Sequence, residues 1–161
     1  MKILVDGDAC PVKAEVEQVA TRHKLRVVIV SNGGLRPSRN PLVQMVTVDE
    51  GPDVADQWIA QNCVAEDIVI TSDIVLASRC LEGGARALRP DGEPFTAANI
   101  GSQLAMRDLM ADLRASSPLS SGGGGGRPFG KSDRSRFLDR LEREIRAARS
   151  ALDQRPRSQE S

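Results

Sequence analysis

Aromatic residues and histidine are scarce in this sequence. Aromatic side chains make up 2% of the 161 residues, with three Phe, one Trp and no Tyr. The core therefore has to be aliphatic, and few rings are available to stack on nucleic-acid bases. His23 is the only histidine, which argues against chemistry that needs a histidine base or several histidine ligands. Cys10, Cys63 and Cys80 are widely spaced and form no Cys-x-x-Cys pair, so we expect no zinc site.

Long hydrophobic runs are absent as well. No apolar stretch of the sequence reaches the roughly 18 residues that a membrane-spanning helix needs, so we expect no membrane partner. The first acid, Asp6, comes too early in the chain for a signal peptide. An odd number of cysteines without a signal peptide is typical of reduced thiols, and we predict a cytoplasmic protein. The length suits a single domain.

Charge is distributed unevenly along the chain although the formal net charge is zero. Residues 1–126 carry 12 basic and 16 acidic side chains, whereas residues 127–157 carry 10 basic and 5 acidic ones. An acidic body can provide a cation site, and a basic C-terminal segment can attract an anionic partner such as RNA. The alternative is a solvated helix whose arginines serve solubility.

Short apolar runs alternate with helical patterns through the first two thirds of the chain. We predict buried strands at residues 3–5, 27–30, 67–70 and 85–88, with an edge strand at 43–48. We predict helices from Pro11 to about His23, after the acids at 49–53, from Ile74 to Gly83-Gly84, and from a cap at Thr96 or Asn99. This order predicts a three-layer α/β/α fold with a mostly parallel central sheet.

The remainder of the chain suggests an appended helix. We expect an α/β domain at residues 1–115, a flexible Gly/Ser-rich linker at 116–131, an amphipathic basic helix at 132–152 and a disordered tail at 153–161. The helix has an apolar stripe that must pack on the body or on another subunit, and the second case would give a homodimer. Its members are Phe137, Leu138, Leu141, Ile145 and Leu152.

Five aspartates are placed where they can converge. Asp6 and Asp8 follow the first strand, Asp73 follows a later one, and Asp53 and Asp56 begin the helix between them. The carboxyl ends of parallel strands form the usual ligand-binding edge of such folds. Converging carboxylates repel one another unless a cation joins them, and Mg²⁺ and Mn²⁺ prefer oxygen ligands. The alternative is that these aspartates cap helices.

Two sets of segments carry a family resemblance. PIN and NYN ribonuclease domains have acidic residues at three positions of the fold, and three segments of this chain resemble these positions in the same order: residues 3–6, 53–56 and 70–73. The chain is more similar to the YaiI/YqxD family of bacterial proteins, and this resemblance covers almost the whole chain. It rests on DGDACPVK at 6–13, TSDIVLA at 71–77, residues 95–109 and RPFGKSDRSRF at 127–137. The resemblance implies a PIN-like fold. PIN and NYN domains usually carry a further acid just after the position that corresponds to Asp73, where this chain has Ile74 and Val75.

Several other side chains near these motifs could contact a phosphate. They are Lys13, Thr71 and Ser72, together with Arg36 and Arg39 in a proline-bounded loop. Each also has a simpler interpretation, because exposed lysines and loop arginines are common and hydroxyls often cap helices.

The leading hypothesis is a Mg²⁺- or Mn²⁺-dependent nuclease that acts on RNA. Asp6, Asp53 and Asp73 would be catalytic and hold the metal, with Asp8 and Asp56 assisting. The first alternative is a non-catalytic protein that binds RNA or another partner on a PIN-like scaffold. The second is a phosphatase of the haloacid-dehalogenase type, in which Asp6 is the nucleophile, Asp8 the acid/base and Thr71 a phosphate ligand.

Overall fold

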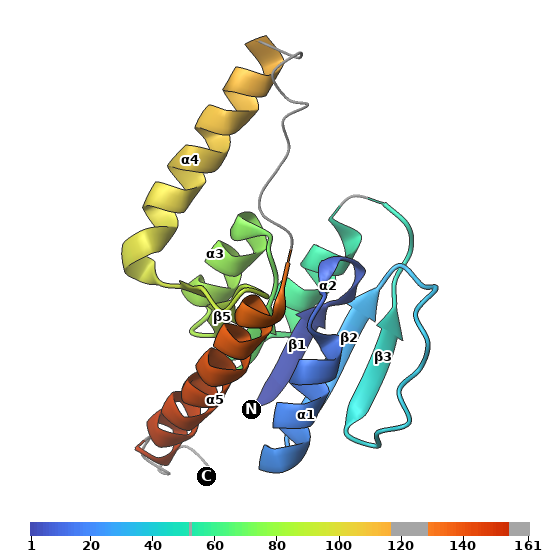
Figure 1. Cartoon of the computed structure of the whole chain (residues 1–161). Coiled ribbons are helices and arrows are strands. Elements are labelled where there is room, and N and C mark those ends of the chain that lie inside the picture. The colour runs from blue at the N-terminus through green and yellow to red at the C-terminus, as the bar shows by residue number, and fades with distance from the viewer. Residues whose placement is uncertain (52, 117–128, 155–161) are drawn as a thin grey trace.

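The computed structural model describes residues 1–51, 53–116 and 129–154 (Figure 1). Within these residues the sheet has six strands in the order β3-β2-β1-β4-β5-β6. The strands are β1 (Lys2–Asp6), β2 (Arg26–Ser31), β3 (Val43–Thr47), β4 (Ile68–Ile70), β5 (Arg86–Leu88) and β6 (Pro94–Phe95). All neighbouring pairs are parallel except β5 and β6. The expected mostly parallel α/β sheet is confirmed.

The sheet places the ends of β1 and β4 side by side. β1 lies at the centre and pairs with β2 on one side and β4 on the other, with Val5 opposite both Ile29 and Ile70. Its apolar run is continuous because both faces of a parallel sheet are covered. Whatever follows β1 and β4 in the sequence therefore meets at one edge of the sheet.

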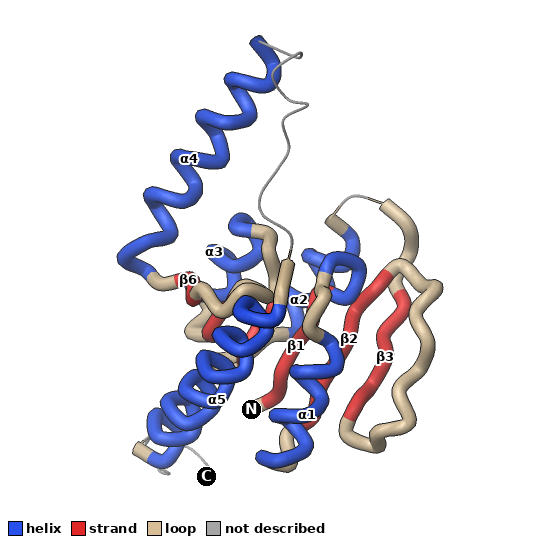
Figure 2. The backbone as a smooth tube through the Cα atoms, viewed as in Figure 1, coloured by secondary structure: helices blue, strands red, loops and turns tan. Residues whose placement is uncertain are grey.

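Helices cover both faces of the sheet and complete the three layers (Figure 2). They are α1 (Lys13–His23), α2 (Val54–Asn62), α3 (Ile74–Glu82), α4 (Ala97–Ser116) and α5 (Lys131–Asp153), and a 3₁₀ turn at Gly7–Ala9 precedes α1. Ile3 and Val5 pack with α1 and α5 on one face, whereas Leu4 packs with α2 and α3 on the other. The core is aliphatic, as the composition predicts, with Phe137 as its largest fully buried side chain.

The apolar stripe of α5 packs on the body of the same chain. Phe137, Leu141 and Ile145 are fully buried together with Ile3 and Leu88. A homodimer through this helix stays a prediction, and it would have to use the outward face of α5. The expected linker and tail lie mostly outside the described residues, which omit 117–128 and 155–161.

The helix α4 leaves the body after its first turns (Figure 1). Thr96 and Asn99 close its start reciprocally: the Asn99 backbone N–H donates to Thr96 Oγ1 at 3.1 Å, and the Thr96 N–H donates to Asn99 Oδ1 at 2.9 Å. Ile100 and Leu104 pack against the cluster around Ala77 and Phe95. Beyond them, four apolar side chains are about half exposed: Met106, Leu109, Met110 and Leu113. Across the part of the chain that the structure describes, no helix meets the length and apolarity required to cross a membrane.

Candidate metal centre

Four of the five predicted aspartates lie along the carboxyl edge of the sheet around β1 and β4. Asp6 is the last residue of β1, and Asp73 directly precedes α3 after the end of β4. Asp53 directly precedes α2, and Asp56 lies in the first turn of that helix. They converge because β1 and β4 are neighbours and because α2 and α3 pack against the same face of the sheet.

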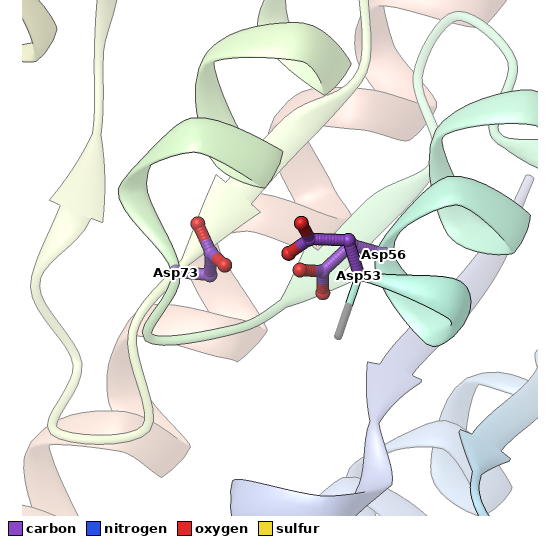
Figure 3. A group of neighbouring side chains, drawn as sticks. All are labelled: Asp53, Asp56 and Asp73. Carbon is purple, nitrogen blue, oxygen red and sulfur yellow. The ribbon is translucent and has the colours of Figure 1, made fainter. Parts of the chain in front are cut away.

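Asp53, Asp56 and Asp73 form the tightest group, which we call the aspartate trio (Figure 3). Each contributes a carboxylate oxygen, and these atoms all lie within 4.8 Å of one another. Asp53 reaches this position from a left-handed backbone conformation with φ of 67°, which costs about 1 kcal/mol or more for a residue other than glycine. A ligand set made of carboxylate oxygens alone fits a hard divalent ion such as Mg²⁺ or Mn²⁺.

Asp73 combines two roles that the sequence left as alternatives. Its Oδ1 accepts hydrogen bonds from the backbone N–H groups of Val75 at 2.9 Å and Leu76 at 3.2 Å, so this side chain caps α3. The same carboxylate also faces Asp53 and Asp56 (Figure 3). The cap fixes the position of the Asp73 carboxylate, so that this side chain is ordered where it faces Asp53 and Asp56.

The electrostatics of the trio favour a proton or a cation between its members. Partial burial raises the pKa of Asp56 to about 7, helped by its hydrogen bond with Asp73 and by the charges of Asp73, Asp6 and Asp53. Near neutral pH, Asp56 is therefore protonated in part of the molecules, and in the rest its negative charge is repelled by the neighbouring carboxylates. A divalent cation would replace that proton and remove the repulsion.

Asp6 lies beside the trio and shares a hydrogen-bond partner with Asp73. The Thr71 Oγ1 hydroxyl donates to Asp6 Oδ2 at 3.3 Å and accepts from the Asp73 backbone N–H at 3.0 Å. Burial raises the pKa of Asp6, the hydrogen bond from Thr71 opposes this rise, and the charges of Asp8 and Asp73 add to it. Thr71 is almost fully buried, and its hydroxyl links the Asp6 carboxylate to the backbone of Asp73.

The other predicted residues are placed less centrally. Asp8 is exposed, and its carboxylate accepts hydrogen bonds from the Asn32 backbone N–H at 3.1 and 3.3 Å. Lys13 donates from Nζ to the Cys10 carbonyl at 2.9 Å, and its charge lies close enough to lower the pKa of Asp6. Ser72 is exposed and lines a hollow together with Asp6 and Asp73.

Neither loop arginine lines the hollows beside the trio. Arg36 and Arg39 are exposed in the segment between β2 and β3. The neighbours of Arg39 are tied to α1, because Ser38 donates to Glu17 Oε1 at 2.5 Å and Asn40 donates to Thr21 Oγ1 at 2.7 Å. These contacts hold Arg39 next to the second half of α1, whereas the aspartates lie at the edge of the sheet where α1 begins.

Three arginines that sequence reasoning missed surround the aspartates. A hollow of about 200 Å³ joins the trio to Arg79 and Arg107. A second hollow of about 590 Å³ lies between Asp6, Asp73, Arg89 and Arg107. Asp73 and Arg107 line both hollows. Arg79 lies on α3, Arg89 follows β5 and Arg107 lies on α4 within the segment 95–109 that carries the family resemblance. Only their position beside the aspartates identifies them as site residues.

Comparison with known proteins places the chain among bacterial relatives. A family model described as "Uncharacterized BCR, YaiI/YqxD family" matches residues 4–147. A UPF0178 protein of Ruegeria pomeroyi is 69% identical over 146 residues, which cover 91% of this chain and 94% of the relative. UPF0178 proteins of Roseobacter denitrificans and Cereibacter sphaeroides are 61% and 57% identical; the alignments cover 91% and 92% of this chain and 95% and 91% of the relatives. No solved structure matches the chain.

Proposed function

The chain belongs to the YaiI/YqxD family, and we propose that it is a divalent-metal-dependent nuclease that hydrolyses phosphodiester bonds in RNA. The observation that carries the proposal is the aspartate trio, whose carboxylate oxygens lie within 4.8 Å of one another. Structural caps do not require three acids from two helix starts to face one another. A divalent cation gives this arrangement a physical reason.

Each aspartate has a role in the proposal. Asp53, Asp56 and Asp73 hold Mg²⁺ or Mn²⁺. Asp6 adds a fourth carboxylate beside them, and it is positioned by its hydrogen bond from the Thr71 hydroxyl. Such an ion, when bound, activates water for attack on phosphorus and stabilises the charge on the leaving oxygen. Thr71 keeps Asp6 and Asp73 oriented, and the α3 cap keeps Asp73 ordered, so both carboxylates are in place before the substrate arrives.

The resemblance to PIN and NYN domains supports a nuclease and a PIN-like fold. The acids stand in the same order along the chain, at the end of β1, the start of α2 and directly before α3. The further acid of those domains is replaced by Ile74, which packs into the core with Ala77 and Phe95, and by the exposed Val75. In this chain Asp56 brings the number of carboxylates facing one another to three.

The phosphatase alternative has less support from the geometry. A haloacid-dehalogenase mechanism would use Asp6 and Asp8 together, but Asp8 is exposed and its carboxylate is hydrogen-bonded to the Asn32 backbone.

The proposal includes a cytoplasmic location, which agrees with the free thiols of Cys10, Cys63 and Cys80.

A cleavage assay on single-stranded and structured RNA tests the proposal. We expect cleavage in Mn²⁺ or Mg²⁺ and none in EDTA. Asp56→Asn and Asp73→Asn should each lower the rate by at least about 100-fold, the size of effect seen when one group that stabilises developing charge is removed. Asparagine at position 73 retains an oxygen that can cap α3, so the loss would not be due to unfolding of that helix.

The matched control is Asp139→Asn, an exposed acid of α5 on the opposite face of the sheet. It should cleave like the wild type. Equal activity in all variants would reveal a contaminating nuclease, and the absence of cleavage on every RNA would contradict the nuclease function. Retained RNA binding without cleavage would then favour the non-catalytic alternative.

A further inference from the structure

We propose that the hollow between α4 and the carboxyl edge of the sheet binds one nucleotide of a single-stranded RNA, with the phosphate at Arg107 and the base against Met106 and Met110. The inference rests on the proposed function, because it names the substrate class for the same site. It also assigns a substrate contact to α4, a helix that carries none of the five aspartates.

The hollow has a suitable size and position. Its volume is about 590 Å³, within the range of small-molecule sites in proteins. It opens next to the trio, and Asp73 and Arg107 form the boundary that it shares with the smaller hollow around Asp53 and Asp56. A nucleotide in the larger hollow would therefore place its phosphate at this boundary, beside the carboxylates that are proposed to hold the metal.

The phosphate side of the hollow carries two arginines. Arg107 is exposed, and no hydrogen bond or ion pair of its side chain is found among the described residues. Arg89 is fixed in place, because its Nη2 donates to Gln103 Oε1 at 2.6 Å and its guanidinium lies over the Phe95 ring, 5.0 Å from the centroid. Within the described residues the buried Nε of Arg89 has no acceptor. Arginine binds phosphate well because its donors match the phosphate oxygens.

The base side of the hollow is made by two methionines. Met106 and Met110 lie one helical turn apart on α4 and are 56% and 50% exposed. Both line the hollow, together with Ile74 at the start of α3. Thioether side chains are polarizable and make favourable contacts with aromatic rings. In a chain with 2% aromatic residues, they provide the apolar contact to a base that aromatic rings provide in other single-strand-binding proteins.

This arrangement selects a single strand over a duplex. A base can lie against Met106 and Met110 only if it has left its stack, whereas a paired base keeps its faces covered by its neighbours. The phosphate contact alone would accept either form. The preference for single strands therefore depends on the methionines, and the salt dependence of binding depends on the arginines.

Fluorescence anisotropy with a labelled, mixed-sequence hexaribonucleotide tests the inference without relying on catalysis. We would titrate the full chain in Ca²⁺, confirm on a gel that the RNA stays intact, and repeat the titration at several salt concentrations. Arg107→Gln should weaken binding by roughly fivefold to tenfold and lower the slope of log K against log salt by about 0.7, the value for one phosphate contact with a single strand. Met110→Ser should weaken binding by roughly threefold and leave the slope unchanged.

The matched control is Arg26→Gln, which removes an exposed arginine at the start of β2, the opposite edge of the sheet. Its affinity and slope should equal those of the wild type. The inference is overturned if Arg107→Gln behaves like this control, or if a duplex binds as tightly as the single strand. It is also overturned if sedimentation shows a dimer that Met110→Ser dissociates, because the methionines would then contact a second copy.

The two proposals fail in different ways. Binding that follows these expectations, without any cleavage, would retain the nucleotide site and refute the nuclease. Metal-dependent cleavage that Arg107→Gln and Met110→Ser leave unchanged would retain the nuclease and refute the nucleotide site.

Discussion

At the scale of single residues, Thr71 determines how the acidic edge is organised. One buried hydroxyl donates to Asp6 and accepts from the Asp73 backbone. Because the two aspartates come from different segments, their relative position depends on this shared contact. Thr71, for which the sequence suggested a phosphate contact or a helix cap, is thus a positioning residue for the site.

Replacing the hydroxyl of Thr71 should therefore cost stability. Thr71→Val has the same shape but leaves the Asp73 N–H without its acceptor, and we expect the free energy of unfolding to fall by about 1–3 kcal/mol. Thr71→Ser retains the hydroxyl and should lose less. Urea denaturation measures both. A larger loss in Thr71→Ser than in Thr71→Val would mean that the methyl group, and not the hydroxyl, is important.

At the scale of secondary-structure elements, α4 and α5 differ in how they use their apolar residues. α5 buries Phe137, Leu141 and Ile145 completely against the sheet. The second half of α4 leaves Met106, Leu109, Met110 and Leu113 about half exposed. α5 is therefore part of the core despite its basic composition, whereas the second half of α4 keeps four large apolar side chains about half exposed.

This difference predicts unequal effects of truncating apolar side chains. Phe137→Ala removes a fully buried ring and should lower the free energy of unfolding by about 3–5 kcal/mol. Leu109→Ala, at a side chain that is 52% exposed, should change it by less than about 1 kcal/mol. Denaturant unfolding at several protein concentrations distinguishes folding from association. A concentration-dependent loss in Phe137→Ala would instead indicate an interface between subunits.

At the scale of the whole molecule, the trio links stability to pH and to divalent cations. The pKa of Asp56 is raised from its ordinary value of 3.8 to about 7, so the folded state holds a proton that the unfolded state releases. The stabilisation from this proton is present below about pH 4 and is lost as the pH rises through 7. In the metal-free protein, this group makes the fold less stable at pH 8 than at pH 5.

A cation should reverse this trend. We expect 5 mM Mn²⁺ to raise the melting temperature at pH 8 by several degrees relative to EDTA, and by less at pH 5, where protons compete for the carboxylates. Asp56→Asn should reduce the Mn²⁺ effect at pH 8 and the pH dependence in EDTA, whereas Asp139→Asn should change neither. Differential scanning fluorimetry measures all of these values. An unchanged Mn²⁺ shift in Asp56→Asn would place the cation elsewhere on the molecule.

Much of the fold was predictable from local patterns. Apolar runs such as 27–30 become buried strands, and Gly83-Gly84 comes directly after α3. These features depend on residues close in sequence, which determine periodicity and turn geometry. Element ends were less accurate, since Pro11 precedes α1 by two residues and α1 begins at Lys13.

The sequence by itself determined the α/β class, the aliphatic core and the candidate aspartates, because apolar periodicity and residue type are local properties. The tertiary structure decided which aspartates face one another, that α5 packs on the body, and that Arg79, Arg89 and Arg107 surround the trio. The physical reason is that convergence depends on strand order and helix packing, which place Asp6 and Arg107, 101 positions apart in the sequence, in the lining of one hollow.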